Sequence, residues 1–556
     1  MNEIAIRGGT LVDGTGSAGV RADIGISNGR IAEIGQNVTG EKTLDASGGV
    51  VAPGFIDIHT HYDAQVFWDS TFTPSCFHGV TTVVAGNCGF SLAPTRFEHR
   101  DLISRTLEKV EDMNLATLNA GIPWDFSTFP EYMSSVKRRG TALNFASYVG
   151  HSALRIFAMG DDAYERAATP DELATMKRAL TDAMHAGATG FSTSFVPIHR
   201  GADGKPVPSR FSTRSELDEL LGVMRDGRRG VVAIAVGDEC PVEDLYELQP
   251  KLGLPLTYVA LLAEESGQHR KYVDLHNEAW ERGIEVFPQV SNRPITFEFS
   301  LASPFNMSAN PAFAELGNSN LAERRRTYAD LEWRQRAAKG FGGGGTFAFT
   351  PLWDSYQIEA SQSHPDFVGK KLVEIAASRG LTPFEAMLDL ALDEGDLALR
   401  IKAMLINYDV DEVTFLLSQE NCALGLSDAG AHINSLCDAP QATDLLGKWV
   451  RERGVMSVET AVRRLSGAQA DLFGFADRGY IRHGFAADVV VFDPATVDPG
   501  PTVRVRDFPA DGERLTAPTP VGVQHVLVNG TPIRVDGEQA PSGVAAHPGQ
   551  MVRPTD

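Results

Sequence analysis

The sequence predicts an α/β protein, a (β/α)8 TIM barrel with a small β-sandwich domain formed from both termini. The barrel is predicted because short apolar runs recur along the middle of the chain and amphipathic helical patterns lie between several of them. The runs are mostly continuous in apolar residues, which is typical of strands buried on both faces. They lie at 55–58, 81–85, 144–149, 190–194, 231–236, 256–261, 285–290 and 423–426. The β-sandwich is predicted because both ends of the chain carry short strand patterns with turn signals such as Asn28-Gly29.

Helical patterns between the runs include 170–186, 215–225 and 269–282. We therefore expect residues 1–52 and 481–556 to form the β-sandwich and residues 53–480 to form the barrel. An insertion is expected at about 291–376, where Gly342–Gly345 predicts a flexible loop.

Composition narrows the classes of partner. The 556 residues carry a net charge of −22 and show no clustered basic surface, so a nucleic-acid partner is not expected. No signal peptide and no apolar run of membrane-spanning length is evident, which predicts no membrane partner. The five cysteines are scattered and odd in number, so reduced thiols and a cytoplasmic location are expected. A small-molecule substrate is the expected partner, and a homo-oligomer remains open.

Polar residues directly after the predicted strands matter most, because barrel active sites lie at the C-terminal ends of strands. His59 and His61 follow the first strand two residues apart, so both imidazoles can face one ion. Cys88 follows the second strand and Asp428 follows the last. Imidazole, thiolate and carboxylate together suit one zinc ion, and Asp428 could also accept a proton from a reacting water. The alternatives are incidental histidines, a buried inert cysteine and a helix N-cap.

Two further histidines have alternatives that the sequence leaves open. His151 ends the third strand, where it could hydrogen-bond a substrate oxygen as a catalytic group or serve a structural role. His432 could orient Asp428, line the pocket or be structural.

The motifs themselves carry a family resemblance. Residues 53–61 (PGFIDIHTH) resemble the opening of the amidohydrolase superfamily, and residues 79–94 (GVTTVVAGNCGFSLAP) are similar to the second-strand signature of its N-acyl-D-amino-acid deacylase (D-aminoacylase) branch. Further matches lie at 149–155, 187–193 and 479–488. The resemblance implies a barrel with a β-sandwich and a metal-dependent hydrolase that acts on carbon–nitrogen bonds other than peptide bonds.

The sequence departs from this branch at two expected metal ligands. The resemblance implies one histidine each after strands five and six, but Ala235 and Ala260 stand there, and Gly237 replaces an adjacent arginine. Glu239 or Glu264 is a weak candidate to fill the gap. No lysine lies on strand four, so a binuclear centre is not expected.

These observations predict hydrolysis of an amide-type bond in a small molecule by metal-activated water, at a mononuclear site. Catalytic roles are expected for Asp428 and His151, and metal ligation for His59, His61, Cys88 and Asp428. Two alternatives remain, a decayed barrel that binds a ligand or acts as a scaffold, and a non-hydrolytic lyase on the same scaffold.

Overall fold

The structure is a computed structural model of the 556-residue chain. It describes residues 1–555 except 305–306, 308–309, 318 and 342–349, so the predicted glycine loop at 342–345 lies outside the described residues. Among the described residues no helix is long and apolar enough to cross a membrane. All five cysteines are free thiols.

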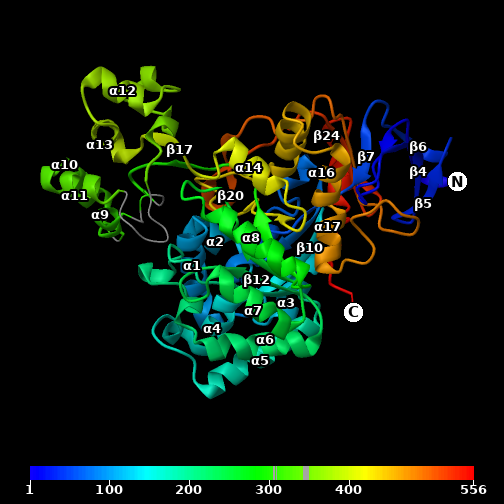
Figure 1. Cartoon of the computed structure of the whole chain (residues 1–556), viewed down its shortest axis with the longest axis horizontal. Coiled ribbons are helices and arrows are strands. Elements are labelled where there is room, and N and C mark those ends of the chain that lie inside the picture. The colour runs from blue at the N-terminus through cyan, green and yellow to red at the C-terminus, as the bar shows by residue number, and fades with distance from the viewer. Residues whose placement is uncertain (305–306, 308–309, 318, 342–349, 556) are drawn as a thin grey trace.

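Eight parallel strands form the predicted barrel (Figure 1). They are β8 (Phe55–Asp57), β9 (Val80–Ala85), β10 (Asn144–Gly150), β11 (Gly190–Ser194), β12 (Val231–Ala235), β13 (Leu256–Val259), β14 (Val286–Val290) and β18 (Ala423–Leu424). Each strand pairs with its neighbour in chain order, and a parallel bridge between Thr60 and Ala429 joins the first strand's end to the last. All eight strand predictions are confirmed, and so is the fold class.

Helices cover the outside of the barrel where the sequence predicts them. Helices α5 (Pro170–His185), α6 (Arg214–Gly227) and α8 (Gln268–Glu281) match the three predicted patterns within two residues at each end. The first two begin where a threonine side chain accepts a hydrogen bond from a backbone N–H of the first turn. The other barrel helices are α1 (Arg100–Val110), α2 (Leu115–Gly121), α3 (Phe129–Arg139), α4 (His151–Met159), α7 (Val242–Leu252), α14 (Val410–Leu417), α15 (Gln441–Asp444), α16 (Val458–Leu465) and α17 (Gly467–Phe473).

The two ends of the chain share a sheet. Strand β7 (Val50–Pro53) pairs antiparallel with β19 (Val489–Phe492), within a seven-stranded sheet in the order β24-β23-β22-β19-β7-β2-β3. A four-stranded sheet of N-terminal strands has the order β5-β4-β1-β6 and lies at the right of Figure 1. The remaining bounds are β1 (Asn2–Arg7), β2 (Thr10–Leu11), β3 (Val20–Arg21), β4 (Asp23–Ser27), β5 (Arg30–Gly35), β6 (Gly40–Asp45), β20 (Val503–Phe508), β21 (Gly512–Thr516), β22 (Val523–Val528), β23 (Thr531–Val535), β24 (Glu538–Gln539) and α18 (Pro541–Ala545).

A separate unit lies between β14 and β18, at the upper left of Figure 1. It has a three-stranded sheet and its own buried cluster, which includes Phe313, Trp333 and Ile401. This unit extends past the predicted end of the insertion at 376. Its elements are β15 (Ile295–Phe299), β16 (Gln357–Ala360), β17 (Arg400–Ile406), α9 (Pro311–Ala314), α10 (Leu321–Ala329), α11 (Leu331–Lys339), α12 (Leu372–Arg379) and α13 (Pro383–Asp393).

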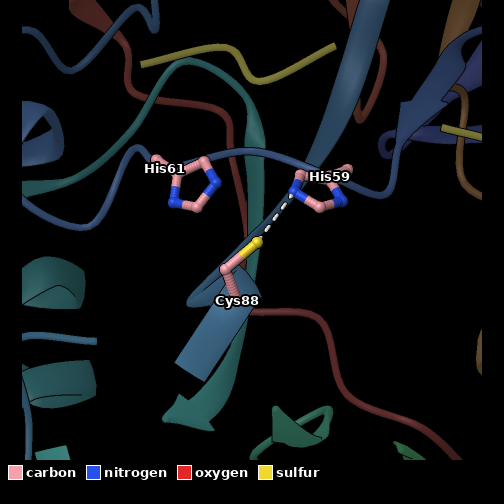
Figure 2. Close-up of side chains that lie close together, drawn as sticks. All are labelled: His59, His61 and Cys88. Carbon is pink, nitrogen blue, oxygen red and sulfur yellow. Dashed lines mark hydrogen bonds between the residues drawn. The ribbon is translucent and has the colours of Figure 1, made fainter. Parts of the chain in front are cut away.

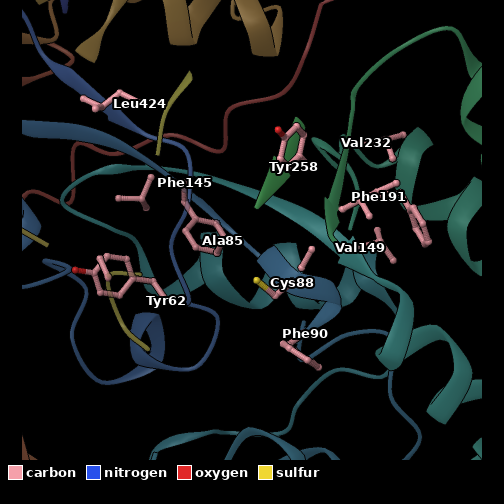
Figure 3. Close-up of a cluster of buried hydrophobic side chains, with 14 of the residues drawn as sticks. Tyr62, Ala85, Cys88, Phe90, Phe145, Val149, Phe191, Val232, Tyr258 and Leu424 are labelled. Carbon is pink, nitrogen blue, oxygen red and sulfur yellow. The ribbon is translucent and has the colours of Figure 1, made fainter. Parts of the chain in front are cut away.

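The main core fills the barrel and the space beneath its helices. Figure 3 shows Cys88 beside Phe90 within this cluster, with Phe191 and Tyr258 from other strands. Burying such side chains supplies the main favourable term in folding. The polar groups at the barrel rim are therefore held by a packed scaffold.

Candidate metal centre

The first strand delivers two histidines to the barrel rim. His59 and His61 follow β8, and both are almost fully buried. The carboxylate of Asp57 accepts the backbone N–H of His59 at 3.2 Å and the hydroxyl of Ser427 at 2.7 Å. This arrangement ties the end of the first strand to the segment after the last strand, which carries Asp428.

A tight turn places Cys88 opposite the histidines. The turn covers Asn87–Gly89 after β9, and Cys88 itself has a left-handed φ of 54°. A side chain on Gly86, where φ is 78°, would meet the carbonyl oxygen of Tyr148 at 2.6 Å, so the turn requires glycine there. The hydroxyl of Ser192 accepts the backbone N–H of Gly89 at 3.0 Å and fixes the turn against β11.

The last strand contributes Asp428, which also has a left-handed φ, of 45°. Non-glycine residues held in this region cluster at functional sites, where the surrounding structure keeps them in place. Asp428 Oδ1 lies 3.2 Å from His59 Nε2 and 3.7 Å from His61 Nε2. The carboxylate therefore faces both imidazoles.

The four predicted ligands come together. Donor atoms of His59, His61 and Cys88 all lie within 4.8 Å of one another, and His59 Nε2 is 3.5 Å from Cys88 Sγ. Figure 2 shows the two rings and the sulfur pointing toward a common point. Two imidazole nitrogens, a thiolate and a carboxylate oxygen are donors that zinc binds in tetrahedral geometry, so this set fits one divalent cation.

A glutamine orients the first histidine. His59 Nδ1 lies 2.8 Å from Gln289 Oε1, and the amide nitrogen of Gln289 donates to the hydroxyl of Thr257 at 3.2 Å. The ring must therefore donate through Nδ1–H, which leaves the lone pair of Nε2 facing Cys88 and Asp428. Partners of this kind fix the tautomer and the ring plane of a ligating histidine.

Glu111 holds the second histidine, and sequence reasoning missed it. Its Oε1 lies 3.1 Å from His61 Nδ1, and its side chain is 3% exposed. The residue caps the C-terminal end of α1, far from any strand end. A carboxylate at a helix C-terminus is electrostatically unfavourable, so a buried one there needs a partner. An acidic residue at the predicted end of a helix is a pattern that could have identified Glu111 from the sequence.

Charge distribution within the cluster favours a cation. Burial alone would lower the pKa of His59, but Cys88 and Asp428 raise that pKa to about 10. Burial would raise the pKa of Cys88, yet the two histidines lower it, and they hold the pKa of Asp428 well below its usual range. The sulfur and the carboxylate are thus favoured as anions, and anionic donors balance a divalent charge.

His151 lies elsewhere in a closed hydrogen-bond network. Its Nδ1 is 2.9 Å from the hydroxyl of Thr193, and its Nε2 is 2.9 Å from Glu216 Oε1. Arg155 completes the network with two contacts of 2.5 Å to the same carboxylate. Since both ring nitrogens have protein partners and the side chain is fully buried, the geometry favours the structural alternative for His151 over the catalytic one.

The two weak candidates for the missing ligands do not join the cluster. Glu239 forms an ion pair with Arg210 at 2.9 Å, and Glu264 accepts the hydroxyl of Ser266 at 2.9 Å. Ala235 ends β12 and Ala260 directly follows β13, as the sequence register indicates. Among the described residues, the cluster able to hold a metal ion contains neither glutamate.

A cavity of about 940 Å3 lies beside the segments that follow Glu111 and Asp428, but the four candidate ligands do not line it. Asp112, which follows Glu111, lines it together with Ser435 from the segment after Asp428. Glu298 and Arg324 line it from the separate unit between β14 and β18. A volume of this size suits a small-molecule ligand.

We expect Glu111→Gln to weaken zinc binding by about 10- to 100-fold, because removing a carboxylate partner of a ligating histidine has that effect. Competition with a chromophoric zinc chelator would measure the affinity. Asp101→Asn, at an exposed position on the same helix, is the matched control and should leave the affinity unchanged. Equal affinity in the two variants would show that Glu111 does not support His61.

Comparisons with known proteins agree with this architecture. The amidohydrolase family profile matches residues 42–296 and 363–534, which leaves out much of the separate unit. D-aminoacylase of Alcaligenes xylosoxydans xylosoxydans is 30% identical over 545 residues, covering 96% of this chain and 94% of that protein.

Two solved structures are similar over nearly the full length. A D-aminoacylase structure, from a study of one-metal activation and second-metal attenuation in its binuclear centre, has a TM-score of 0.68 at 26% identity and covers 100% of both chains. N-acyl-D-glutamate deacylase of Bordetella bronchiseptica, complexed with zinc and a phosphonate inhibitor, has a TM-score of 0.65 at 28% identity and covers 99% of both chains. The chain therefore belongs to the amidohydrolase family, on the branch of the D-aminoacylases, hydrolases that act on carbon–nitrogen bonds other than peptide bonds.

Proposed function

We propose that this protein hydrolyses an amide-type carbon–nitrogen bond of a small molecule at a mononuclear metal site, with zinc as the expected ion. One observation carries the proposal, the convergence of His59, His61, Cys88 and Asp428 at the C-terminal rim of the barrel. A bound cation would supply a Lewis acid and a water of lowered pKa.

Asp428 has the proton-transfer role in this proposal. It accepts a proton from the attacking water as the new carbon–oxygen bond forms, and it gives that proton to the nitrogen as the carbon–nitrogen bond breaks. The products are an acid and an amine, so one water is consumed for each bond cleaved. Before the first step His59 and His61 keep the carboxylate ionised, so that it can accept the proton.

A single ion is proposed because two expected ligands are absent. Alanine at 235 and 260 offers no lone pair, and β11 presents Ser192 and Ser194 rather than a lysine that could bridge two ions. The D-aminoacylase study speaks of activation by one metal, which is compatible with one ion being sufficient here.

The substrate is proposed to be less anionic than those of the named relatives, which are deacylases of N-acyl-D-amino acids. Gly237 stands where that branch would place an arginine, so a clamp for a free carboxylate is missing at this position. A neutral amide, a cyclic amide or a urea fits better. A cytoplasmic location is part of the proposal, since all five cysteines are free thiols.

The test combines metal content with product analysis. Protein expressed with added zinc should retain about one zinc per chain by mass spectrometry. It should also hydrolyse at least one member of a panel of N-acetyl-D-amino acids, p-nitroacetanilide, dihydrouracil and hydantoin. An open-chain amide would release an amine and an acid, and a cyclic one would open to a single ureido acid. Exhaustive chelation should abolish turnover, and added zinc should restore it. Full activity after chelation would contradict the proposal.

Cys88→Ser separates a ligand from a buried inert thiol. If the sulfur binds the ion, this variant should lose most of its zinc, because a hydroxyl is a far weaker donor than a thiolate. Cys422→Ser is the matched control, since Cys422 is also buried but lies apart from the cluster. A barrel that neither retains zinc nor turns over any of the panel would instead support the decayed scaffold, the alternative that the two alanines favour.

A further inference from the structure

A third imidazole lies at the rim, in the loop after strand four. Strand β11 ends at Ser194, and the ring of His199 returns to that strand end, where its Nδ1 lies 2.7 Å from Ser194 Oγ. The same oxygen accepts the backbone N–H of Val196 at 3.3 Å. The hydroxyl hydrogen of Ser194 is then free to be donated to Nδ1, which leaves the ring proton of His199 on Nε2.

Strand register places this ring beside one of the two alanines. Ser194 and Ala235 are partners in the pairing of β11 with β12, and the N–H of Phe195 donates to the carbonyl of Ala235 at 2.8 Å. The serine that holds His199 is therefore next to the position where the related family would carry a ligating histidine.

The ring also packs against the turn that carries the thiol. His199 makes an edge contact with Phe90, with 5.5 Å between ring centroids, and Phe90 lies two residues after Cys88. On either side of His199, Ile198 and Arg200 line the 940 Å3 cavity. The ring therefore lies against the turn that carries Cys88, within a segment whose neighbouring residues border the cavity.

Its electrostatic surroundings keep the ring neutral. Burial lowers the pKa of His199 to about 4, and the charges that act on it come from Glu111, His432, His61 and Asp428. At neutral pH the ring is a hydrogen-bond donor through Nε2 without a positive charge. Donors of this kind stabilise oxygen atoms on which negative charge develops.

We infer that His199, held by Ser194, is the donor that binds the substrate's carbonyl oxygen and stabilises the oxyanion of the tetrahedral intermediate. The inference rests on the proposed hydrolase function and assigns to His199 the role first expected for His151, whose two ring nitrogens both have protein partners. The proposed role of His199 is to bind the substrate's oxygen and does not include holding the ion.

The test uses zinc-loaded full-length protein and three substitutions. His199→Phe should lower kcat by about 100-fold on the amide that gives turnover in the panel, with zinc content and KM little changed. His199→Gln keeps an N–H donor and should recover part of that loss. His185→Phe, at an exposed position on α5, is the matched control and should match the unsubstituted protein.

A second readout does not depend on turnover. Methylphosphonate carries a tetrahedral anionic group, and calorimetric titration should show that His199→Phe binds it at least tenfold more weakly than His185→Phe does. If His199→Phe keeps its zinc, its kcat and its methylphosphonate affinity, the inference is wrong and the hydrolase proposal stands. If His199→Phe loses its zinc, the histidine is a ligand, which also overturns the inference. Absence of zinc and turnover in the unsubstituted protein would overturn both.

Discussion

Asp428→Asn is expected to lower kcat by about 1,000-fold, within the range found for loss of a positioned proton-transfer group. The amide oxygen can still face the ion, but an amide neither accepts a proton from water nor returns one to the leaving nitrogen. Steady-state kinetics on the amide identified by the substrate panel would measure the effect. The expected loss falls mainly on kcat, because the substitution removes chemistry and leaves the cavity unchanged.

The control for this substitution is Asp218→Asn, which changes an exposed aspartate on α6 whose partner is Arg214. It should leave kcat unchanged. A value of kcat for Asp428→Asn within threefold of that control would show that Asp428 does not transfer the proton.

Glu216→Gln is expected to reduce the free energy of unfolding by about 3–5 kcal/mol at pH 7, the usual cost of breaking a buried ion pair. The guanidinium of Arg155 is fully buried, and the substitution leaves it without an anionic partner. The amide oxygen of the new glutamine would still accept a hydrogen bond from His151, so the substitution removes only the negative charge. Urea unfolding followed by fluorescence would measure the change.

The same carboxylate makes stability depend on pH. Burial alone would raise the pKa of Glu216, but His151 and Arg155 lower it to about 2. Because the folded-state pKa is below the unfolded value, the stabilisation is fully present above about pH 4.5 and is lost as pH falls toward 2. The difference in stability between the unsubstituted protein and Glu216→Gln should therefore narrow over that interval.

Glu219→Gln, on the exposed face of the same helix, is the matched control. Its ion pair with Lys177 is solvent-exposed, so we expect its free energy of unfolding to stay within about 0.5 kcal/mol of that of the unsubstituted protein. This difference should not depend on pH between about 4.5 and 2. Equal unfolding free energies for the two variants at pH 7 would show that the buried pair does not stabilise the fold.

The sequence predicted the barrel strands and the meeting of His59, His61, Cys88 and Asp428 for one physical reason. In a parallel barrel all strands end at the same rim, so residues that directly follow strands come together even when they are hundreds of positions apart. Only the positions of the strand ends are needed for this prediction, and continuous apolar runs mark those ends clearly.

Residues on loops and helices could not be found in that way. Glu111 reaches His61 from the end of α1, and His199 reaches the rim by a loop that folds back onto Ser194. His151 shows the opposite case, a residue whose position at a strand end predicts catalysis although its observed contacts favour a structural role. Its partner Glu216 comes from a helix 65 residues further along the chain, and no local pattern shows that this helix closes over it.

Anomalous diffraction at the zinc edge, from crystals grown with zinc, would test the four-donor site itself. We expect one strong peak among His59 Nε2, His61 Nε2, Cys88 Sγ and Asp428 Oδ1, within about 2.0–2.4 Å of each donor. No peak at this position would contradict this expectation, as would a peak that touches neither histidine.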